Sequence, residues 1–166
     1  PEVRTLIENS IADVIKEEYP EADVIMGTAT AGIAHAAIAA HILGLPMGYV
    51  RSGAKDHGRG NQIEGQLNKG DKVVIVEDLI STGGSVIDAA TALRNAGAEV
   101  LGIVSIFTYG MQKGLDRLAQ ENLKNISLTN FDVISEVAVD ENYIRPEDRE
   151  RLIAFRNNPS DEGWIK

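Results

Sequence analysis

The chain lacks cysteine, a membrane-spanning run and a secretory signal. Having no cysteine among its 166 residues, it can form no disulfide bond, thiol nucleophile or thiolate zinc site. No apolar run approaches the ~18 residues that a transmembrane helix requires. The opening Pro1-Glu2-Val3-Arg4 leads into an acidic amphipathic segment, which is not a signal-peptide pattern. These absences favour a cytoplasmic protein with no membrane partner.

Basic side chains are scarce: 16 Lys and Arg face 25 Asp and Glu, for a formal net charge of −9. Nucleic acid is therefore not an expected partner, because a polyanion would be repelled. The cations are also unevenly spread, since residues 51–70 carry four of them against two acids. Such an island can attract one small anionic ligand while the remaining surface stays negative.

Internal repeats, low-complexity tracts and Pro/Ser-rich linkers are missing too. The length suits one domain, and an apolar content of 43% is ordinary for a folded protein. We therefore expect residues 1–166 to form a single domain. Because the first residue is Pro rather than Met, we also expect the sequence to open part-way into a longer or processed protein.

Apolar periodicity alternates between helix and strand along the chain. It predicts helices over 2–18, 33–43, 86–96, 111–121, 131–137 and 146–156, strands over 23–27, 47–50, 72–76 and 100–107, and a short element near 126–128. This order is typical of an α/β fold with a mainly parallel, Rossmann-like sheet flanked by helices. Ligands bind such sheets at the carboxyl ends of the strands, so loops 27–32, 51–65 and 77–85 are candidates.

The segment 77–85 carries the densest chemical signal. Two carboxylates, Glu77 and Asp78, follow an apolar strand and precede a turn rich in hydroxyls and glycine. Glycines let the backbone approach a ligand, and the N-terminus of the following helix favours phosphate. Carboxylates would repel phosphate but suit sugar hydroxyls or Mg²⁺. The segment predicts a sugar-phosphate site; an ordinary helix N-cap is the alternative.

This segment resembles the phosphoribosyl-pyrophosphate (PRPP) motif of the type I phosphoribosyltransferases. Residues 51–60, Arg-Ser-Gly-Ala-Lys-Asp-His-Gly-Arg-Gly, resemble the flexible catalytic loop of the bacterial orotate phosphoribosyltransferases within that family. Residues 27–34 resemble the family's pyrophosphate loop. The resemblance implies the family's core fold and transfer of the 5-phosphoribosyl group from PRPP to orotate. The products would be orotidine 5′-monophosphate and pyrophosphate, a step of pyrimidine biosynthesis.

The resemblance also assigns roles to residues. It implies catalytic roles for Arg51, Lys55 and His57 on the leaving pyrophosphate, where cationic donors stabilise the charge that accumulates. The residues implied in PRPP binding are Arg51, Lys55, His57, Glu77, Asp78, Leu79, Ile80, Ser81, Thr82, Gly83, Gly84 and Ser85. The implied pyrophosphate loop is Thr28, Ala29, Thr30, Ala31 and Gly32. Ser81 and Thr108 match orotate-contacting positions.

Mg²⁺ is the implied cofactor, held through PRPP and water with Asp78 as a possible ligand. The family also implies a homodimer in which loop 51–65 completes the partner's site. The chain departs from many relatives at Ala31, where they carry Lys, and at Thr108, where some carry Arg. We further expect it to lack the N-terminal hood that covers the base in full-length relatives.

Three alternatives stay open from the residues alone. The cations at 51–59 could be a solvated loop that is basic by chance. The same fold could transfer phosphoribosyl to another base, such as a purine. It could also serve a non-catalytic PRPP-sensing regulator, although the charge of −9 and the absence of a helix-turn-helix pattern argue against nucleic-acid binding.

Overall fold

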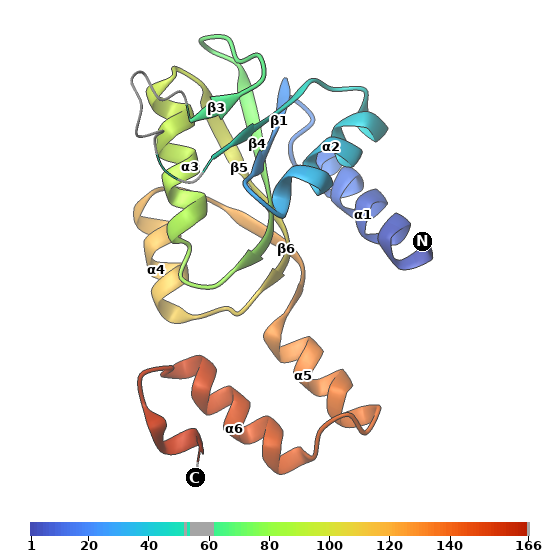
Figure 1. The fold of residues 1–166 in the computed structure, drawn as a ribbon, viewed down its shortest axis with the longest axis vertical. Coiled ribbons are helices and arrows are strands. Elements are labelled where there is room, and N and C mark those ends of the chain that lie inside the picture. Colours follow the sequence, from blue (N-terminus) through green and yellow to red (C-terminus); the bar gives the residue numbers. More distant parts are fainter. Residues whose placement is uncertain (52, 54–61, 166) are drawn as a thin grey trace.

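A six-stranded sheet forms the centre of the computed structural model, which describes residues 1–51, 53 and 62–165 (Figure 1). The strand order is β3-β2-β1-β4-β5-β6. The strands are β1 (Val24–Thr28), β2 (Met47–Val50), β3 (Ile63–Glu64), β4 (Lys72–Ile80), β5 (Glu99–Thr108) and β6 (Asn125–Asn130). Neighbouring strands are parallel except for β2 and β3, which are antiparallel. The predicted mainly parallel sheet is confirmed.

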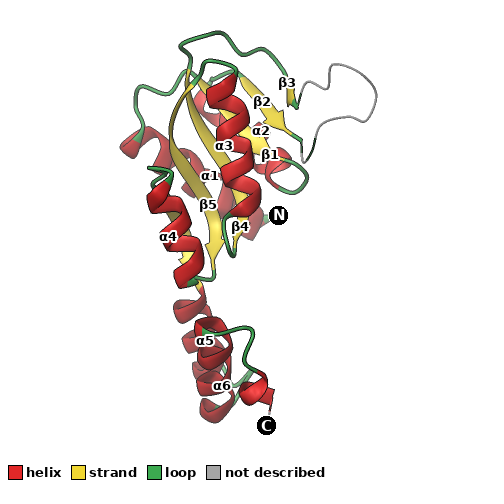
Figure 2. Ribbon diagram, turned by 90° about the vertical axis from the view of Figure 1, so that its left-hand side faces the viewer, coloured by secondary structure: helices red, strands yellow, loops and turns green. Residues whose placement is uncertain are grey.

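Helices cover both faces of this sheet (Figures 1 and 2). They are α1 (Glu2–Glu18), α2 (Gly32–Leu43), α3 (Gly84–Asn95), α4 (Gln112–Gln120), α5 (Phe131–Asp140) and α6 (Pro146–Asn157), followed by the short 3-10 helix η1 (Glu162–Ile165). Helices α1 and α2 pack on one face, and α3 and α4 pack on the other. The two faces bury separate apolar cores, as expected for a doubly covered parallel sheet.

The central strand β4 is buried on both sides. Val73 and Ile75 belong to the core beneath α3, whereas Val74 and Val76 belong to the core beneath α1 and α2. Successive side chains of a strand point to opposite faces, so a strand covered twice needs an unbroken apolar run. The run at 73–76 meets this requirement.

Two strands differ from the prediction. β4 continues to Ile80, past both acids, because its backbone stays paired with β5: Glu77 lies opposite Ser105 and Ile80 opposite Thr108. The acids therefore lie within the last part of the strand. β3 lies inside the predicted loop 51–66, and its two residues are too few to show any periodicity. Its pairing with β2 comes from the tertiary structure.

The C-terminal helices α5 and α6 lie beyond the end of β6, away from the sheet, and η1 follows them (Figures 1 and 2). Arg156 holds α6 to α5 through an ion pair with Asp132, with 3.0 Å between Nη1 and Oδ2. The ring centroids of Phe155 and Trp164 lie 5.0 Å apart, and this contact holds η1 against α6. Among the described residues, no helix combines the length and the apolar character needed to cross a membrane.

Candidate functional site

The turn between β1 and α2 lies directly against the end of β4. The Thr28 hydroxyl donates to the Val76 carbonyl oxygen at 3.3 Å. A Cβ added at Gly32 would lie 2.6 Å from that same oxygen and 3.5 Å from the Cα of Glu77, so only glycine allows this approach. The predicted pyrophosphate loop and the predicted sugar-phosphate segment therefore meet at one edge of the sheet.

Glu77 is a buried carboxylate at this meeting point, with 5% of its surface exposed. One oxygen accepts from the Asp78 backbone N–H at 3.0 Å, and the other lies 3.5 Å from the Ser85 hydroxyl. Burial raises the pKa of Glu77 to about 7; the side-chain hydrogen bond with Asp78 also raises it, while the bond with Thr28 opposes the shift. Glu77 is thus poised to gain or lose its charge near neutrality.

The three residues after Glu77 face different surroundings. Asp78 is half-buried, Leu79 is exposed, and the Ile80 side chain lies in the apolar core beneath α3. Ile80 can therefore reach a ligand only through its backbone. Asp78 is the carboxylate of this pair that is more accessible from outside, which suits a hydroxyl or a hydrated cation.

The turn that follows leaves the start of α3 without a side-chain cap. Gly83 is the N-cap residue, with φ of 74°, and it makes no side-chain capping bond. Ser85 instead directs its hydroxyl to Glu77. The N-cap of α3 is therefore a glycine rather than a serine or threonine. The N-terminal N–H groups of α3 remain suited to an anion.

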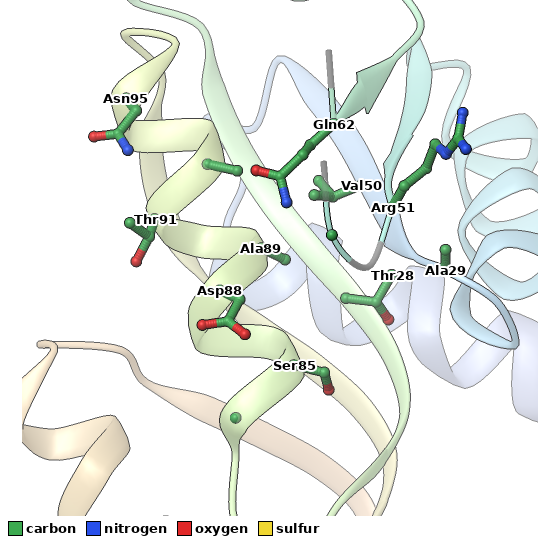
Figure 3. A pocket seen from close by; sticks show the side chains of 13 residues that line it. Thr28, Ala29, Val50, Arg51, Gln62, Ser85, Asp88, Ala89, Thr91 and Asn95 are labelled. Atoms are coloured by element: carbon green, nitrogen blue, oxygen red, sulfur yellow. The ribbon is translucent and has the colours of Figure 1, made fainter. Parts of the chain in front are cut away.

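A pocket of about 540 Å³ runs from this edge along α3, between that helix and the ends of β1 and β2 (Figure 3). Thr28, Ala29 and Arg51 line one side, and Ser85 and Asp88 line the other. Thr91 and Asn95 extend the wall of α3 that begins with Ser85 and Asp88. The sequence analysis did not include Asp88, although polar residues at 85, 88, 91 and 95 follow a helical period.

Arg51 lines the pocket, but its guanidinium pairs with Glu64 at 3.1 Å and points away from α3 in Figure 3. Two other predicted cations, Lys55 and His57, lie outside the described residues. Thr30 and Ala31 are exposed, and the peptide bond between Ala29 and Thr30 is cis. Of the predicted catalytic residues, the structure therefore places Arg51 alone, near the predicted pyrophosphate loop.

Thr108 ends β5 beside Ile80 of β4. Its hydroxyl donates to the Ile80 carbonyl oxygen at 3.4 Å and accepts from the Gly110 backbone N–H at 3.1 Å. The ring centroid of Tyr109 lies 5.1 Å from that of Phe107 and 5.5 Å from that of Phe131. Thr108 thus lies next to the segment 81–85, beside an aromatic cluster that the sequence analysis did not identify.

Glu8 is a second buried carboxylate. The sequence analysis missed it, because residues 2–18 were assigned to a helix from the spacing of their apolar residues alone. Glu8 is 2% exposed and lies on α1. One of its oxygens lies 2.7 Å from Nδ1 of His35 on α2. This contact ties α1 to the helix that follows the predicted pyrophosphate loop.

Comparison with known proteins agrees with this geometry. Residues 2–142 match the family model described as phosphoribosyl transferase domain. The chain is 56% identical to orotate phosphoribosyltransferase from Listeria innocua over all 166 residues, which span 78% of that protein. It is 52% identical to the Bacillus subtilis enzyme of the same name over 166 residues and 77% of that protein. The chain belongs to the orotate phosphoribosyltransferases.

The fold of this family is also confirmed by a solved structure. The crystal structure of orotate phosphoribosyltransferase from Aeropyrum pernix matches with a TM-score of 0.72 at 30% identity. That match covers 80% of this chain and 73% of the other. The predicted orotate phosphoribosyltransferase resemblance and its α/β core are therefore correct. Helix α6 and η1 lie beyond the part that matches the family model.

Proposed function

We propose that the chain transfers the 5-phosphoribosyl group from PRPP to orotate, yielding orotidine 5′-monophosphate and pyrophosphate. The observation that carries the proposal is the junction of Glu77, Asp78, the uncapped start of α3 and the turn at 28–32. Orotate as the acceptor is supported by the names of relatives that are 56% and 52% identical over the whole chain.

The donor has a complementary subsite for each of its groups. Its 5′-phosphate lies on the turn 81–85, where backbone N–H groups and hydroxyls donate. Its ribose hydroxyls donate to Glu77 and Asp78, and its pyrophosphate lies over the loop 28–32. This placement keeps the phosphates off the two carboxylates, which would repel them.

The reaction exchanges two bonds at the anomeric carbon. The bond from C1 to the pyrophosphate oxygen breaks, and a bond from C1 to a ring nitrogen of orotate forms, through an oxocarbenium-like state as in glycoside cleavage. Negative charge accumulates on the departing pyrophosphate. Arg51, Lys55 and His57 would stabilise that charge more than the ground state. The proton on the orotate nitrogen leaves as the bond forms, and the departing pyrophosphate can accept it, so no strong protein base is required.

The residues at the end of β4 fit a Mg²⁺ ion that is held mainly by PRPP and water. Both oxygens of Glu77 already accept from protein donors, whereas Asp78 is the more accessible carboxylate. The described residues contain no cluster of three or more His, Asp or Glu that could bind a metal by themselves. Bound Mg²⁺ would neutralise charge on the phosphates. Asp78 would contact it directly or through water.

We also propose a homodimer in which the segment 51–65 completes the partner's site, with Ser81 and Thr108 contributing to the orotate subsite. Exposed apolar side chains on α1 and α2, Val3, Leu6 and Ile42, are compatible with a protein contact. Sedimentation analysis should give twice the chain mass of 17.9 kDa. A cytoplasmic location stays a prediction.

The test of the proposed function is product analysis. The chain is incubated with PRPP and Mg²⁺ and with orotate, adenine, hypoxanthine or uracil in parallel. Orotidine 5′-monophosphate with one equivalent of pyrophosphate is the expected product. If a nucleotide forms only with another base, that base and not orotate is the acceptor. PRPP binding without any product would favour the regulator.

Lys55→Ala tests the cationic loop. We expect turnover to fall ~100-fold or more while PRPP affinity changes far less, because the charge to be stabilised develops on the leaving group. Lys16→Ala, on an exposed position of α1, is the matched control and should keep full turnover. Unchanged turnover in Lys55→Ala would remove this residue from the catalytic loop.

A further inference from the structure

One side of helix α4 packs against the segment 81–85 (the phosphate turn), which follows β4. A Cβ added at Gly114 would collide with the Ser81 carbonyl oxygen, so the backbones of α4 and the turn are in direct contact. Arg117 follows three residues later and therefore lies on the same side of the helix. The turn thus has a second wall, formed by a helix far from it in sequence.

Arg117 reaches across to the turn itself. Its Nη1 donates to the Thr82 carbonyl oxygen at 3.1 Å. The two terminal nitrogens lie 3.5 and 3.9 Å from the place where a Cβ of Gly84 would stand. The guanidinium is half-buried and lies beside the first residue of α3.

The charge of the turn explains why a cation here matters. Residues 77–85 contain two acids and no basic side chain. A phosphate monoester carries nearly two negative charges at neutral pH, and a helix N-terminus offers only about half a positive charge. A guanidinium stays charged and has five N–H donors, and the bond to Thr82 uses one of them.

We propose that Arg117 belongs to the 5′-phosphate subsite, where it positions the turn through Thr82 and supplies the positive charge that the motif lacks. The inference rests on the proposed function, because it takes residues 81–85 as the place of the phosphate. It adds a residue from α4 to a site that the sequence motif confines to β4 and α3.

Arg94 provides a matched control at the opposite end of α3. Its Nη2 donates to the Glu121 carbonyl oxygen at 3.0 Å, so it also links α3 to the end of α4. Both Arg94 and Arg117 are half-buried and donate to a main-chain oxygen, but Arg94 lies in the last turn of α3 and also pairs with the Glu121 carboxylate at 3.8 Å. Removing it weakens a helix contact without touching the phosphate turn.

The experiment compares two ligands that occupy different subsites. Calorimetry measures binding of ribose 5-phosphate and of inorganic pyrophosphate to the unmodified chain and to Arg117→Gln, Arg117→Lys and Arg94→Gln. We expect Arg117→Gln to bind ribose 5-phosphate ~10-fold more weakly, as for loss of a charge-assisted contact. Pyrophosphate affinity should change less than ~2-fold. Arg117→Lys should recover part of the loss, because it restores the charge but not the planar fork.

Each outcome decides a different claim. Unchanged ribose 5-phosphate affinity in Arg117→Gln, or an equal loss in Arg94→Gln, would overturn the role of Arg117 and leave the proposed function intact. No ribose 5-phosphate binding by the unmodified chain would overturn the phosphate placement itself, and the Arg117 assignment with it. If Arg117→Gln fails to fold, Arg117→Lys is compared with Arg94→Gln instead. A purely structural role of Arg117 predicts that Arg117→Lys loses affinity equally for ribose 5-phosphate and for pyrophosphate, whereas the proposed role predicts a loss mainly for ribose 5-phosphate.

Discussion

The ends of β4 and β1 lie side by side at one edge of the sheet but are built in opposite ways. The end of β4 carries a buried acid, a half-buried acid and a glycine turn backed by α4. The end of β1 carries a buried Thr28 and then small or exposed residues, without a charged side chain between 28 and 34. The cation that lines the same pocket as Thr28, Arg51, is paired with Glu64.

This difference separates a preformed subsite from one that depends on another segment. The geometry at β4 is held by strand pairing, by Gly114 and by Arg117, so it needs little rearrangement on binding. At β1 the turn is held by the Thr28 hydroxyl on the Val76 carbonyl oxygen and by the close approach of Gly32 to β4, but it carries no charged side chain. We propose that the positive charge for a pyrophosphate comes from residues 51–59, where the sequence concentrates it.

The largest expected effect on ligand affinity falls on the preformed side. Asp78→Asn should weaken PRPP binding in Mg²⁺ by ~10- to 100-fold, because it removes a charged acceptor of the ribose hydroxyls or of a hydrated cation. Calorimetry measures the affinity, and Asp13→Asn on exposed α1 is the control. Equal affinities for Asp78→Asn and Asp13→Asn would exclude Asp78 from the ribose subsite.

A pH titration tests how the charge of Glu77, at the end of β4, affects ligand binding. With its pKa at about 7, Glu77 is mostly neutral at pH 6 and mostly ionised at pH 8. The ratio of ribose 5-phosphate affinity in the unmodified chain to that in Glu77→Gln should therefore rise several-fold over this range. Using the ratio removes the titration of the phosphate itself. A flat ratio would show that the charge of Glu77 does not affect binding.

The same shift has a consequence for stability. Because the folded pKa lies above the ordinary value of 4.5, Glu77 stabilises the fold at low pH, and that contribution is lost as pH rises through 7. The unmodified chain should lose about 1 kcal/mol more unfolding free energy than Glu77→Gln between pH 6 and 8. Urea denaturation at both pH values measures this difference.

The smallest effect is expected at β1. Glu64→Gln removes the partner of Arg51, and both side chains are over a third exposed, so the free energy of unfolding should change by no more than ~0.5 kcal/mol. Pyrophosphate should bind up to ~3-fold more tightly, because Arg51 becomes available. Glu18→Gln, which breaks a similar surface pair with Lys124, should leave pyrophosphate affinity unchanged.

The sheet was predictable because its signals are local. The apolar run at 73–76 predicts β4, and Gly44 predicts the end of α2. The observed bounds of both elements differ from the predicted ones by only a few residues. β3 was not predictable, since its two residues depend on pairing with β2. The extension of β4 to Ile80 likewise depends on β5, which no local pattern reports.

The sequence by itself determined the α/β order, the sugar-phosphate motif at 77–85 and the concentration of cations at 51–59, because each is written in consecutive residues. Tertiary structure alone decided which of two adjacent acids is buried, and so raised the pKa of Glu77. It also decided that Gly32 and Gly114 allow close backbone contacts, and that Arg117 lies on the phosphate turn. Burial and long-range contacts depend on the packing of several elements, so no single stretch of sequence encodes them.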